Sequence, residues 1–409
     1  MGRAHHDDER GGLLGAQADQ DRATRVRRPA LNHTSTVLFD LDGTITDPRA
    51  GITASLRHAL VRLGLEAGSD ERLARCIGPP LQDAFADLGV PAGRVDDAIA
   101  RYREHYDAGA LHDVELHAGV PELLARLIDR GCRLGVATSK PWVYAERILD
   151  ELDLRDRFDV VAGAELDGTN RSKADVVADA LRRLGGPDPS SVVLVGDRHH
   201  DVRGARAHGV GSIGVGWGFA EPGELAAADA DLVVDQVAEL AEVLTTRAGS
   251  DGPPMRRAVR AIVADRDDRV LLVHWLRPHV DIWISPGGGV ESGERTRSTL
   301  QRELVEEIGL HGARIGPIVL TRSFQVRRDG TWRGQRESWR LVRVDRFDPP
   351  PLEDLPDAVE EGIVELRWWT LDELRTAPEG RIQHDTVEAI AAALAAPEVP
   401  RPVHTSPFD

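Results

Sequence analysis

Residues 37–44 read VLFDLDGT, and this stretch decides how the first half of the chain folds. Three apolar residues run directly into Asp40 and Asp42, two carboxylates separated by one residue. Later apolar runs alternate with helical stretches, which is typical of a parallel sheet wound with helices. We therefore expect both carboxylates at the carboxyl edge of a parallel sheet, where open α/β sheets bind ligands.

Later segments add polar side chains to the same predicted edge. Thr138 and Asp197 each follow an apolar run, Asp201 comes four residues after Asp197, and Lys173 opens a predicted helix. Carboxylates that converge on one edge repel unless a divalent cation lies among them. A transferring phosphoryl group also needs positive charge near its oxygens. The pattern therefore indicates phosphoryl chemistry assisted by a cation.

In order and spacing, these elements resemble the haloacid dehalogenase (HAD) superfamily of phosphohydrolases across residues 35–246. The resemblance implies an α/β fold with a Rossmann-like parallel sheet and a covalent aspartyl-phosphate mechanism. Asp40 would attack phosphorus, and Asp42 would act first as general acid and then as general base. Thr138 would bind the transferring phosphoryl group, and Lys173 would offset its charge.

The same resemblance implies a Mg²⁺ ion, with Mn²⁺ as an alternative. Its ligands would be Asp40, the backbone carbonyl of Asp42, and Asp197. Asp201 has two interpretations: a contact of the metal site, as ligand or as acceptor behind the ligands, or a carboxylate that merely stabilises a helix start. Lys140 and Lys173 are the only lysines among 51 basic residues, and a compact ammonium at Lys173 is consistent with a tight site.

A helical cap is expected over residues 50–117, inserted after the first strand. This part of the chain resembles the phosphoglycolate-phosphatase-like group, which has a mobile cap. The loop Gly78–Leu81 either closes over a small phosphomonoester and excludes water, or is a plain turn between helices. Lys140 is either a second compact ammonium in a tight site or, as we expect, a solvated residue beside Pro141. His199 and His200 suggest a metal-binding pair by residue type, but adjacent residues on a helix point in different directions, so we expect both to be solvated.

Residues 288–310 read GGVESGERTRSTLQRELVEEIGL. At ~100° per residue of an α-helix, Glu303, Glu306 and Glu307 fall in one wedge beside an apolar stripe. Acids at this spacing destabilise a helix unless a cation lies among them, and Mg²⁺ prefers such oxygen ligands. Arg302 is expected to orient a carboxylate through a bidentate pair. The alternative is an acidic, solvated helix, but the complete pattern favours a metal site.

This stretch fits the Nudix box, G-x5-E-x7-R-E-U-x-E-E-x-G-U with U aliphatic, at every fixed position. The chain resembles Nudix hydrolases across residues 256–396. The resemblance implies an α/β/α domain with a mixed sheet that cleaves a nucleoside diphosphate linked to another group, by attack of water on phosphorus. Glu303, Glu306 and Glu307 would hold the metal, and Glu294 would be a further ligand or the base.

Hydrophobic patterning predicts the remaining elements. The expected strands of the first body span 36–39, 133–137, 159–162, 192–195 and 211–215. Those of the second body span 257–264, 269–275, 314–326, 337–344 and 363–369, with helices at about 295–308 and 383–395. We expect a disordered leader at 1–34, a linker at 247–255 and a disordered tail at 397–409, from their polar, Gly-rich or Pro-rich composition.

Composition narrows the function classes. The chain has 51 Lys and Arg against 68 Asp and Glu, and this net charge of −17 argues against a nucleic-acid-binding face or docking on an anionic membrane. No stretch approaches the ~18 apolar residues of a membrane helix. Two cysteines cannot form a disulfide framework, which favours a reducing cytoplasm.

The two resemblances together predict a two-domain, Mg²⁺-dependent hydrolase. Its substrates would be small phosphorylated metabolites or nucleotides, and the sequence predicts no oligomeric state. In one alternative, one domain is active and the other is a nucleotide-sensing regulatory module; in another, the protein is a scaffold without activity. The complete sets of acids favour catalysis in both domains, because a binding module has little use for them.

Overall fold

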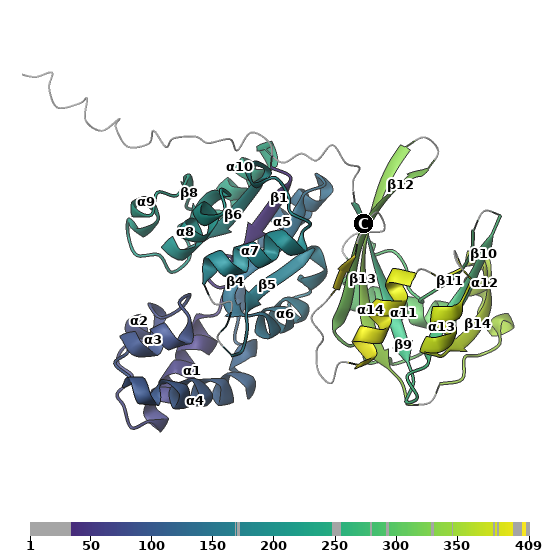
Figure 1. Ribbon diagram of the computed structural model, residues 1–409, viewed down its shortest axis with the longest axis horizontal. Coiled ribbons are helices and arrows are strands. Elements are labelled where there is room, and N and C mark those ends of the chain that lie inside the picture. The colour runs from purple at the N-terminus through teal and green to yellow at the C-terminus, as the bar shows by residue number, and fades with distance from the viewer. Residues whose placement is uncertain are drawn as a thin grey trace, which may run out of the picture.

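The computed structural model contains two bodies, each built on its own sheet (Figure 1). It describes residues 34–247 apart from 168, 170 and 171, residues 255–395 apart from 279, 292, 293, 329, 330, 346, 379, 380 and 383, and residues 403–405. The expected leader, except for Thr34, and residues 248–254 of the expected linker lie outside this described part. None of the helices described is both long and apolar enough to cross a membrane.

A six-stranded parallel sheet forms the centre of the first body, in the order β5-β4-β1-β6-β7-β8. The strands are β1 (Thr36–Phe39), β4 (Arg133–Pro141), β5 (Val160–Ala164), β6 (Val192–Gly196), β7 (Gly211–Val215) and β8 (Leu232–Val234). Each neighbouring pair runs parallel. The carboxyl ends of these strands therefore meet at one edge, as the apolar runs predict.

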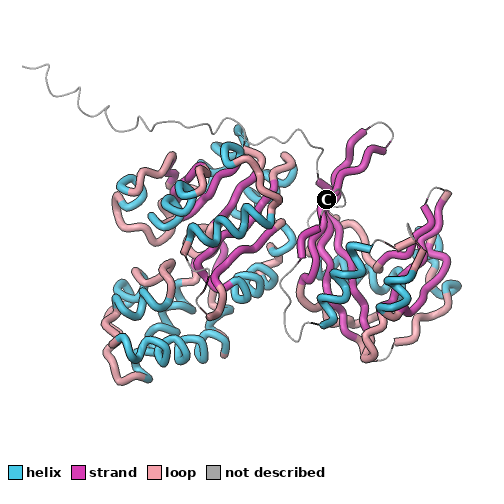
Figure 2. The backbone as a smooth tube through the Cα atoms, in the orientation of Figure 1, coloured by secondary structure: helices cyan, strands magenta, loops and turns pink. Residues whose placement is uncertain are grey.

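Helices cover both faces of this sheet (Figure 2). Because side chains alternate along a strand, Val37 and Phe39 pack into one hydrophobic core and Leu38 into another. The first core is covered by α5 (Val120–Asp129), α6 (Trp142–Glu151) and α10 (Val237–Arg247), and the second by α7 (Lys173–Arg183) and α8 (His199–Ala207). A short helix, α9 (Glu224–Ala227), packs against α8.

The helical cap leaves the sheet and returns to it through one short hairpin. β2 (Thr46–Asp47) pairs antiparallel with β3 (Glu115–Leu116), and the cap helices lie between them in sequence. These helices are α1 (Arg49–Arg62), α2 (Asp70–Ala74), α3 (Leu81–Asp87) and α4 (Val95–Asp107). Figure 1 shows them grouped together beside the sheet. Their buried side chains extend the first core, so the cap and the sheet share apolar packing.

A seven-stranded mixed sheet forms the second body, in the order β11-β10-β9-β13-β12-β15, with β14 paired to β10. The strands are β9 (Met255–Ala264), β10 (Val270–Arg277), β11 (Val280–Ile284), β12 (Ile318–Arg328), β13 (Thr331–Arg343), β14 (Ile363–Trp369) and β15 (Val403–Thr405). One face packs on α11 (Thr296–Ile308) and α12 (Pro356–Glu361), and the other on α13 (Leu371–Thr376) and α14 (His384–Ala395). This arrangement has the predicted α/β/α layers.

Several elements differ from the sequence expectation. The expected strand at 314–326 begins only at Ile318, because Gly316 and Pro317 precede it. β11 and β8 have no counterpart among the predicted strands. The expected disordered tail contains β15, which pairs parallel with β12, whereas residues 396–402 and 406–409 lie outside the described part. A three-residue strand gains its order from its partner, so its own sequence carries little signal.

Candidate active sites

Lys173 lies between two aspartates, one that follows strand β1 and one at the start of helix α8. Its Nζ atom is 2.8 Å from Asp40 Oδ1, which follows β1, and 2.7 Å from Asp201 Oδ1 at the start of α8. The ammonium also donates to the carbonyl of Ala137, at 3.0 Å. Ser172 caps α7 by accepting from Asp175 N at 3.1 Å, which fixes Lys173 as the first helical residue. The helix start thus directs a buried cation at the sheet edge.

Asp40, Asp197 and Asp201 form one acidic group. Each has a carboxylate oxygen within 4.8 Å of those of the other two, and all three side chains are buried. Asp197 accepts a hydrogen bond from Phe219 N at 2.7 Å through Oδ2, whereas its Oδ1 atom is buried without a hydrogen-bond partner. Among the described residues, this is the one group of three possible ligands gathered so closely. It could hold a metal ion.

Burial dominates the electrostatics of this group. It raises the pKa of Asp197 well above the usual range, and the nearby Asp201 and Asp40 charges raise it further. Burial also raises the pKa of Asp201, although Lys173 opposes the effect. For Lys173, burial lowers the pKa, but the Asp201 and Asp40 carboxylates outweigh it and the net shift is upward. Lys173 is therefore charged. Its single charge does not offset the burial of the acids, because the pKa values of Asp197 and Asp201 stay raised beside it.

Backbone packs closely against these acids. Gly43 adopts φ = +85°, and a Cβ atom there would lie 2.3 Å from Asp197 Oδ2. No side chain fits at that distance, so glycine is required both by conformation and by space. The glycine of the DLDGT stretch thus allows the loop after β1 to close over Asp197.

Asp42 is held by Lys140, contrary to the expectation that Lys140 is solvated. The ammonium is 2.9 Å from Asp42 Oδ1 and 2.9 Å from the Tyr106 hydroxyl on cap helix α4, and its side chain is only 6% exposed. Burial raises the pKa of Asp42, and Lys140 opposes this increase. The prediction for Lys140 was wrong because its partners are distant in sequence.

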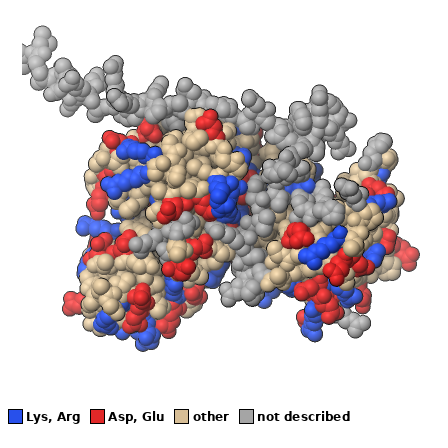
Figure 3. Space-filling model, viewed as in Figure 1, with Lys and Arg blue, Asp and Glu red and all other residues tan. Residues whose placement is uncertain are grey.

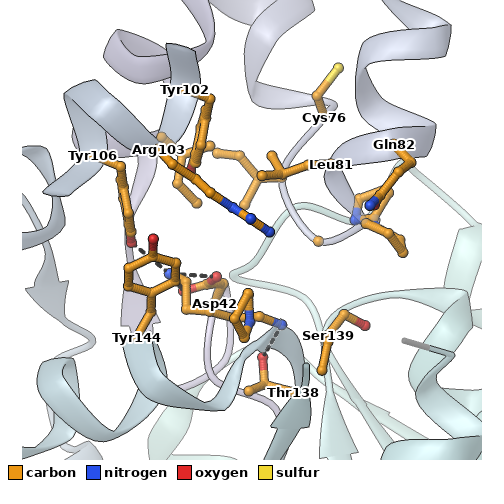
Figure 4. A pocket seen from close by; sticks show the side chains of 18 of the residues that line it. Asp42, Cys76, Leu81, Gln82, Tyr102, Arg103, Tyr106, Thr138, Ser139 and Tyr144 are labelled. Atoms are coloured by element: carbon orange, nitrogen blue, oxygen red, sulfur yellow. Dashed lines mark hydrogen bonds and ion pairs between the residues drawn. The ribbon is translucent and has the colours of Figure 1, made fainter. Parts of the chain in front are cut away.

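A cavity of about 80 Å³ separates the cap from the sheet edge. Asp40, Asp42 and Thr138 line it from the sheet, and the loop Gly78–Leu81 lines it from the cap. Figure 4 shows Arg103 reaching from the cap helix into this space. The loop thus borders the same cavity as the acids, whichever of its two interpretations holds. Thr138 Oγ1 accepts from Lys140 N at 3.2 Å, so its own hydrogen can be donated elsewhere.

The two histidines after Asp197 also differ from expectation. His199 is 25% exposed, and its Nδ1 atom lies 2.7 Å from Glu224 Oε1. His200 stacks against His199, with ring centroids 3.9 Å apart, and burial lowers its pKa to about 4. They are partly buried rather than solvated, and neither belongs to the acidic group.

Helix α11 carries the acids of the second body. Leu300, Leu304 and Ile308 are fully buried against β9, which turns Glu303 and Glu307 toward the loop before the helix. Glu307 Oε2 accepts from Gly287 N at 2.6 Å. Burial raises the pKa of Glu307 to about 8, with opposition from Arg260. The helix spacing predicted from sequence is thus realised in the fold.

Arg302 engages several acids of this helix. It forms a bidentate pair with Glu294, with N–O distances of 3.3 and 3.4 Å, and its Nη1 atom lies 2.8 Å from Glu306 and 3.0 Å from Glu303. Glu303, Glu306 and Glu307 do not form a group as close as that of the first body, among the residues that the structure describes. The guanidinium of Arg302 therefore contacts Glu303 and Glu306, two of the three acids expected to bind a metal.

Comparisons with known proteins assign a family to each of the two bodies. The family model described as haloacid dehalogenase-like hydrolase matches residues 37–215, and the NUDIX domain model matches residues 254–389. A 5'-nucleotidase of Pseudomonas aeruginosa is 40% identical over 220 residues, which are 54% of this chain and 99% of that protein. The chain is a HAD-like hydrolase fused to a NUDIX domain.

Other relatives of the HAD domain have varied names. Tyrosine-protein kinase PtkA of Mycobacterium tuberculosis is 43% identical over 183 residues, which cover 45% of this chain but only 62% of that protein. A crystal structure of a predicted phosphatase from Clostridium acetobutylicum has 35% identity and a TM-score of 0.51, and the match covers 52% of this chain and 99% of that one. The HAD–NUDIX chain is therefore a hydrolase of families that act on small phosphorylated substrates.

The HAD domain also uses residues that sequence analysis missed. Tyr106 and Arg103 come from the cap and line the cavity, and Arg103 Nη2 donates to the carbonyl of Leu166 at 2.8 Å. The one sequence signal for these two residues was their position in the predicted helical cap.

On the face drawn in Figure 3, acidic and basic side chains are interspersed over both domains.

Proposed function

We propose that the HAD domain is a phosphomonoesterase that works through an aspartyl phosphate on Asp40. One observation carries the proposal: three buried carboxylates lie within 4.8 Å of one another, and Lys173 contacts two of them. Burial raises the pKa values of Asp197 and Asp201. The ionised form of these two carboxylates is therefore unfavourable unless further positive charge binds beside them.

A divalent cation fits this need. The Asp197 Oδ1 atom is buried without a hydrogen-bond partner, and hard cations prefer carboxylate oxygens. Asp40, the backbone carbonyl of Asp42, and Asp197 would hold Mg²⁺ or Mn²⁺, with Asp201 as a further ligand or as an acceptor behind the others. When bound, the cation supplies positive charge to the phosphoryl oxygens.

The chain's own residues account for the proton transfers. Asp40 attacks phosphorus, the bond from phosphorus to the ester oxygen breaks, and Asp42 gives its proton to that oxygen. Asp42 then takes a proton from water, which attacks the aspartyl phosphate and releases inorganic phosphate. Burial raises the pKa of Asp42, which favours the protonated form needed for the first step. Thr138 would donate to a phosphoryl oxygen.

The size of the cavity favours a small substrate. At about 80 Å³ it is several times smaller than the roughly 300–1,000 Å³ of sites for drug-sized ligands. A small phosphomonoester, such as phosphoglycolate, fits this space better than a nucleoside monophosphate. Nucleotides would require the cap to move away from the sheet edge.

For the NUDIX domain, we propose hydrolysis of a nucleoside diphosphate linked to another group. Glu303, Glu306 and Glu307 would hold Mg²⁺, with Glu294 as ligand or base. The support is that Glu303 and Glu307 are both buried and that burial raises both pKa values. A cation beside them would keep both ionised, in which case Arg302 must share Glu303 and Glu306 with it.

The two activities would act in sequence. Cleavage of a diphosphate can yield a phosphomonoester, which is the substrate class of the HAD domain. The alternative, in which one domain only senses nucleotide, leaves one full set of acids without a use.

Hydrolysis assays on the full chain test these proposals. Purified protein is given a panel of small phosphomonoesters, nucleoside monophosphates and nucleoside diphosphate derivatives, with Mg²⁺, with Mn²⁺ and with EDTA. We expect metal-dependent phosphate release from a small phosphomonoester and metal-dependent cleavage of a diphosphate. Full activity in EDTA would contradict the proposed metal requirement. A domain that hydrolyses nothing in the panel would favour the alternative in which that domain senses nucleotide.

A further inference from the structure

A row of aspartates on the HAD domain faces the NUDIX domain. The row consists of Asp150, Asp153, Asp156 and Asp159, one at every third position. It runs from the end of α6, through a short turn at Arg155–Arg157, to the residue before β5. Each of the four contacts a side chain of the NUDIX domain. We call this set the aspartate row.

Asp150 pairs with two arginines from different NUDIX elements. Its Oδ1 atom is 2.6 Å from Arg340 Nη1 on β13, and its Oδ2 atom accepts from Arg297 on α11. The Arg340 side chain is only 1% exposed. A guanidinium buried this deeply needs a carboxylate, because desolvation of an unpaired charge is very costly. The HAD domain supplies that carboxylate.

The opposite end of the row is buried equally well. Asp159 Oδ2 is 2.7 Å from Arg336 Nη2 on β13, and these side chains are 2% and 5% exposed. Arg336 Nη1 also donates to the backbone carbonyl of Arg157 at 2.8 Å. Asp156, 3% exposed, accepts from Arg257 on β9. The Asp159–Arg336 pair is thus almost completely desolvated, whereas Arg257 keeps part of its side chain in solvent, at 21% exposure.

Asp153 adds a backbone signal to the charge pairs. It has φ = 55°, a left-handed conformation that glycine usually adopts just after a helix. An aspartate at such a position is strained relative to glycine. Its Oδ1 atom accepts from Thr296 Oγ1 at 3.1 Å, and Thr296 begins α11. The hydrogen bond from Thr296 therefore accounts for an aspartate at position 153, where the backbone conformation favours glycine.

The row joins the two catalytic sites through two helices. α6 carries Tyr144 in the wall of the phosphatase cavity and reaches the row at Asp150. α11 begins at the row, with Thr296 and Arg297, and carries Glu303 and the other acids about two to three turns later. Both helices are therefore held against the opposite domain at one end.

We propose that the aspartate row is a docking surface for the NUDIX domain of the same chain, and that it keeps the two catalytic domains together without the covalent link. Its partner is recognised by charge: four carboxylates meet the arginines of β9, β13 and α11, and a hydroxyl at Thr296. We expect the contact to persist, because separating the domains would break the ion pairs of Arg336 and Arg340, whose side chains are 5% and 1% exposed when the domains are together.

Cutting the connection after folding tests this proposal. A protease site is placed within residues 248–254 of the full chain, the folded protein is cleaved, and the fragments are examined by size-exclusion chromatography and light scattering at micromolar concentration. We expect one species with the mass of a single intact chain. Two separate species at this concentration would overturn the proposal, and a mass of two chains would assign the contact to a second copy.

Charge reversal tests whether the ion pairs carry the association. Arg336→Glu with Arg340→Glu should raise the dissociation constant of the cleaved protein by roughly a hundredfold or more, since loss of one member of a buried pair costs that much. The control is Arg101→Glu, a partly exposed residue of cap helix α4 that pairs, among the residues described, with Asp97 and Glu104 of its own helix. It should leave the association unchanged.

A conservative variant guards against misfolding. Asp156→Asn keeps the shape but removes the charge that meets Arg257, and circular dichroism and uncleaved activity report whether the fold is intact. We expect a folded protein with weaker association after cleavage. If Asp156→Asn and the double reversal both fold and both associate as tightly as wild type, the aspartate row is not the docking surface.

Discussion

Lys140 Nζ lies 2.9 Å from Asp42 Oδ1, although the two residues are 98 positions apart in the chain. The same ammonium is 2.9 Å from the hydroxyl of Tyr106 on the cap. Lys140 therefore connects the proposed general acid to the cap. Because burial raises the pKa of Asp42 and Lys140 lowers it, the lysine would set the pH range over which Asp42 acts as the proposed base.

Replacing Lys140 should shift the pH dependence of phosphomonoester hydrolysis. In Lys140→Gln the cation is lost, so the pKa of Asp42 rises further and its ionised form appears only at higher pH. We expect the acidic limb of the kcat profile to move upward by roughly one pH unit. Tyr106→Phe removes a hydroxyl but no charge, so its acidic limb should stay in place. An unshifted limb in Lys140→Gln would show that Asp42 is not the group that titrates.

Asp40→Asn should abolish phosphomonoesterase activity, because an amide cannot form the aspartyl phosphate. Diphosphate cleavage by the NUDIX domain should continue, so the phosphomonoester product should accumulate without release of inorganic phosphate. The measurement follows both products by chromatography in wild type and variant. Inorganic phosphate released by the variant at the wild-type rate would exclude Asp40 as nucleophile. If the wild-type HAD domain does not hydrolyse the monoester product when it is added directly, the two activities do not act in sequence.

Glu307→Gln should cut diphosphate hydrolysis by orders of magnitude while the protein remains folded, because the change deletes charge from the proposed metal site and removes no volume. The control is Glu360→Gln on the exposed side of α12, which should retain full activity. Normal turnover by Glu307→Gln across a Mg²⁺ titration would contradict the ligand assignment.

The raised pKa of Glu307 also predicts a pH effect on stability in EDTA. Burial raises this pKa to about 8 from an ordinary value of 4.5, so the folded state holds a proton that the unfolded state has lost. Metal-free wild type should therefore lose stability as pH rises from about 4.5 to about 8. Glu307→Gln should lack this contribution and have the higher thermal midpoint at pH 8. Equal midpoints for the two proteins across this range would argue against it.

Glu224 provides the opposite dependence on pH. Burial alone would raise its pKa, but hydrogen bonds from the backbone of His199 and Glu221 and from the side chains of His199 and Arg198 lower it to about 2. Its stabilising effect should be complete above pH 4.5 and disappear as pH falls through about 2. Glu224→Gln should cost about 2 kcal/mol at pH 7, measured by urea unfolding. A gap that persists undiminished at pH 3 would contradict the ionic origin.

Local patterns predicted the parts of the fold whose causes are local. β1 and β7 have the predicted bounds, because short apolar runs end there in Asp40 and Gly216. Helix α11 begins within one residue of its expected start, because the apolar stripe and the acids repeat at helical spacing. The gathering of Asp40 and Asp197 followed from a topological rule about parallel strands.

Contacts between distant segments were beyond such patterns. Lys140 resembles a surface residue in sequence, because its partner Asp42 lies in another motif and its second partner Tyr106 lies in the cap. The expectation for His199 failed for the same reason, since Glu224 belongs to a separate helix. Arg302 was correctly expected to form a bidentate pair, but that its partner is Glu294, eight residues earlier and before the helix, depends on how the loop folds back.

The aspartate row has a consequence for the inheritance of this chain. If a free-standing phosphatase acquired a NUDIX domain by gene fusion, the surfaces of the two domains would at first be hydrated and would lack complementary charges. Asp150 and Arg340, or Asp159 and Arg336, could then be replaced only in concert, since a single reversal places like charges in a dry contact. Among descendants of such a fusion, these positions should covary as pairs, and exchanging one module for a homologue should fail unless both sides of the contact travel with it.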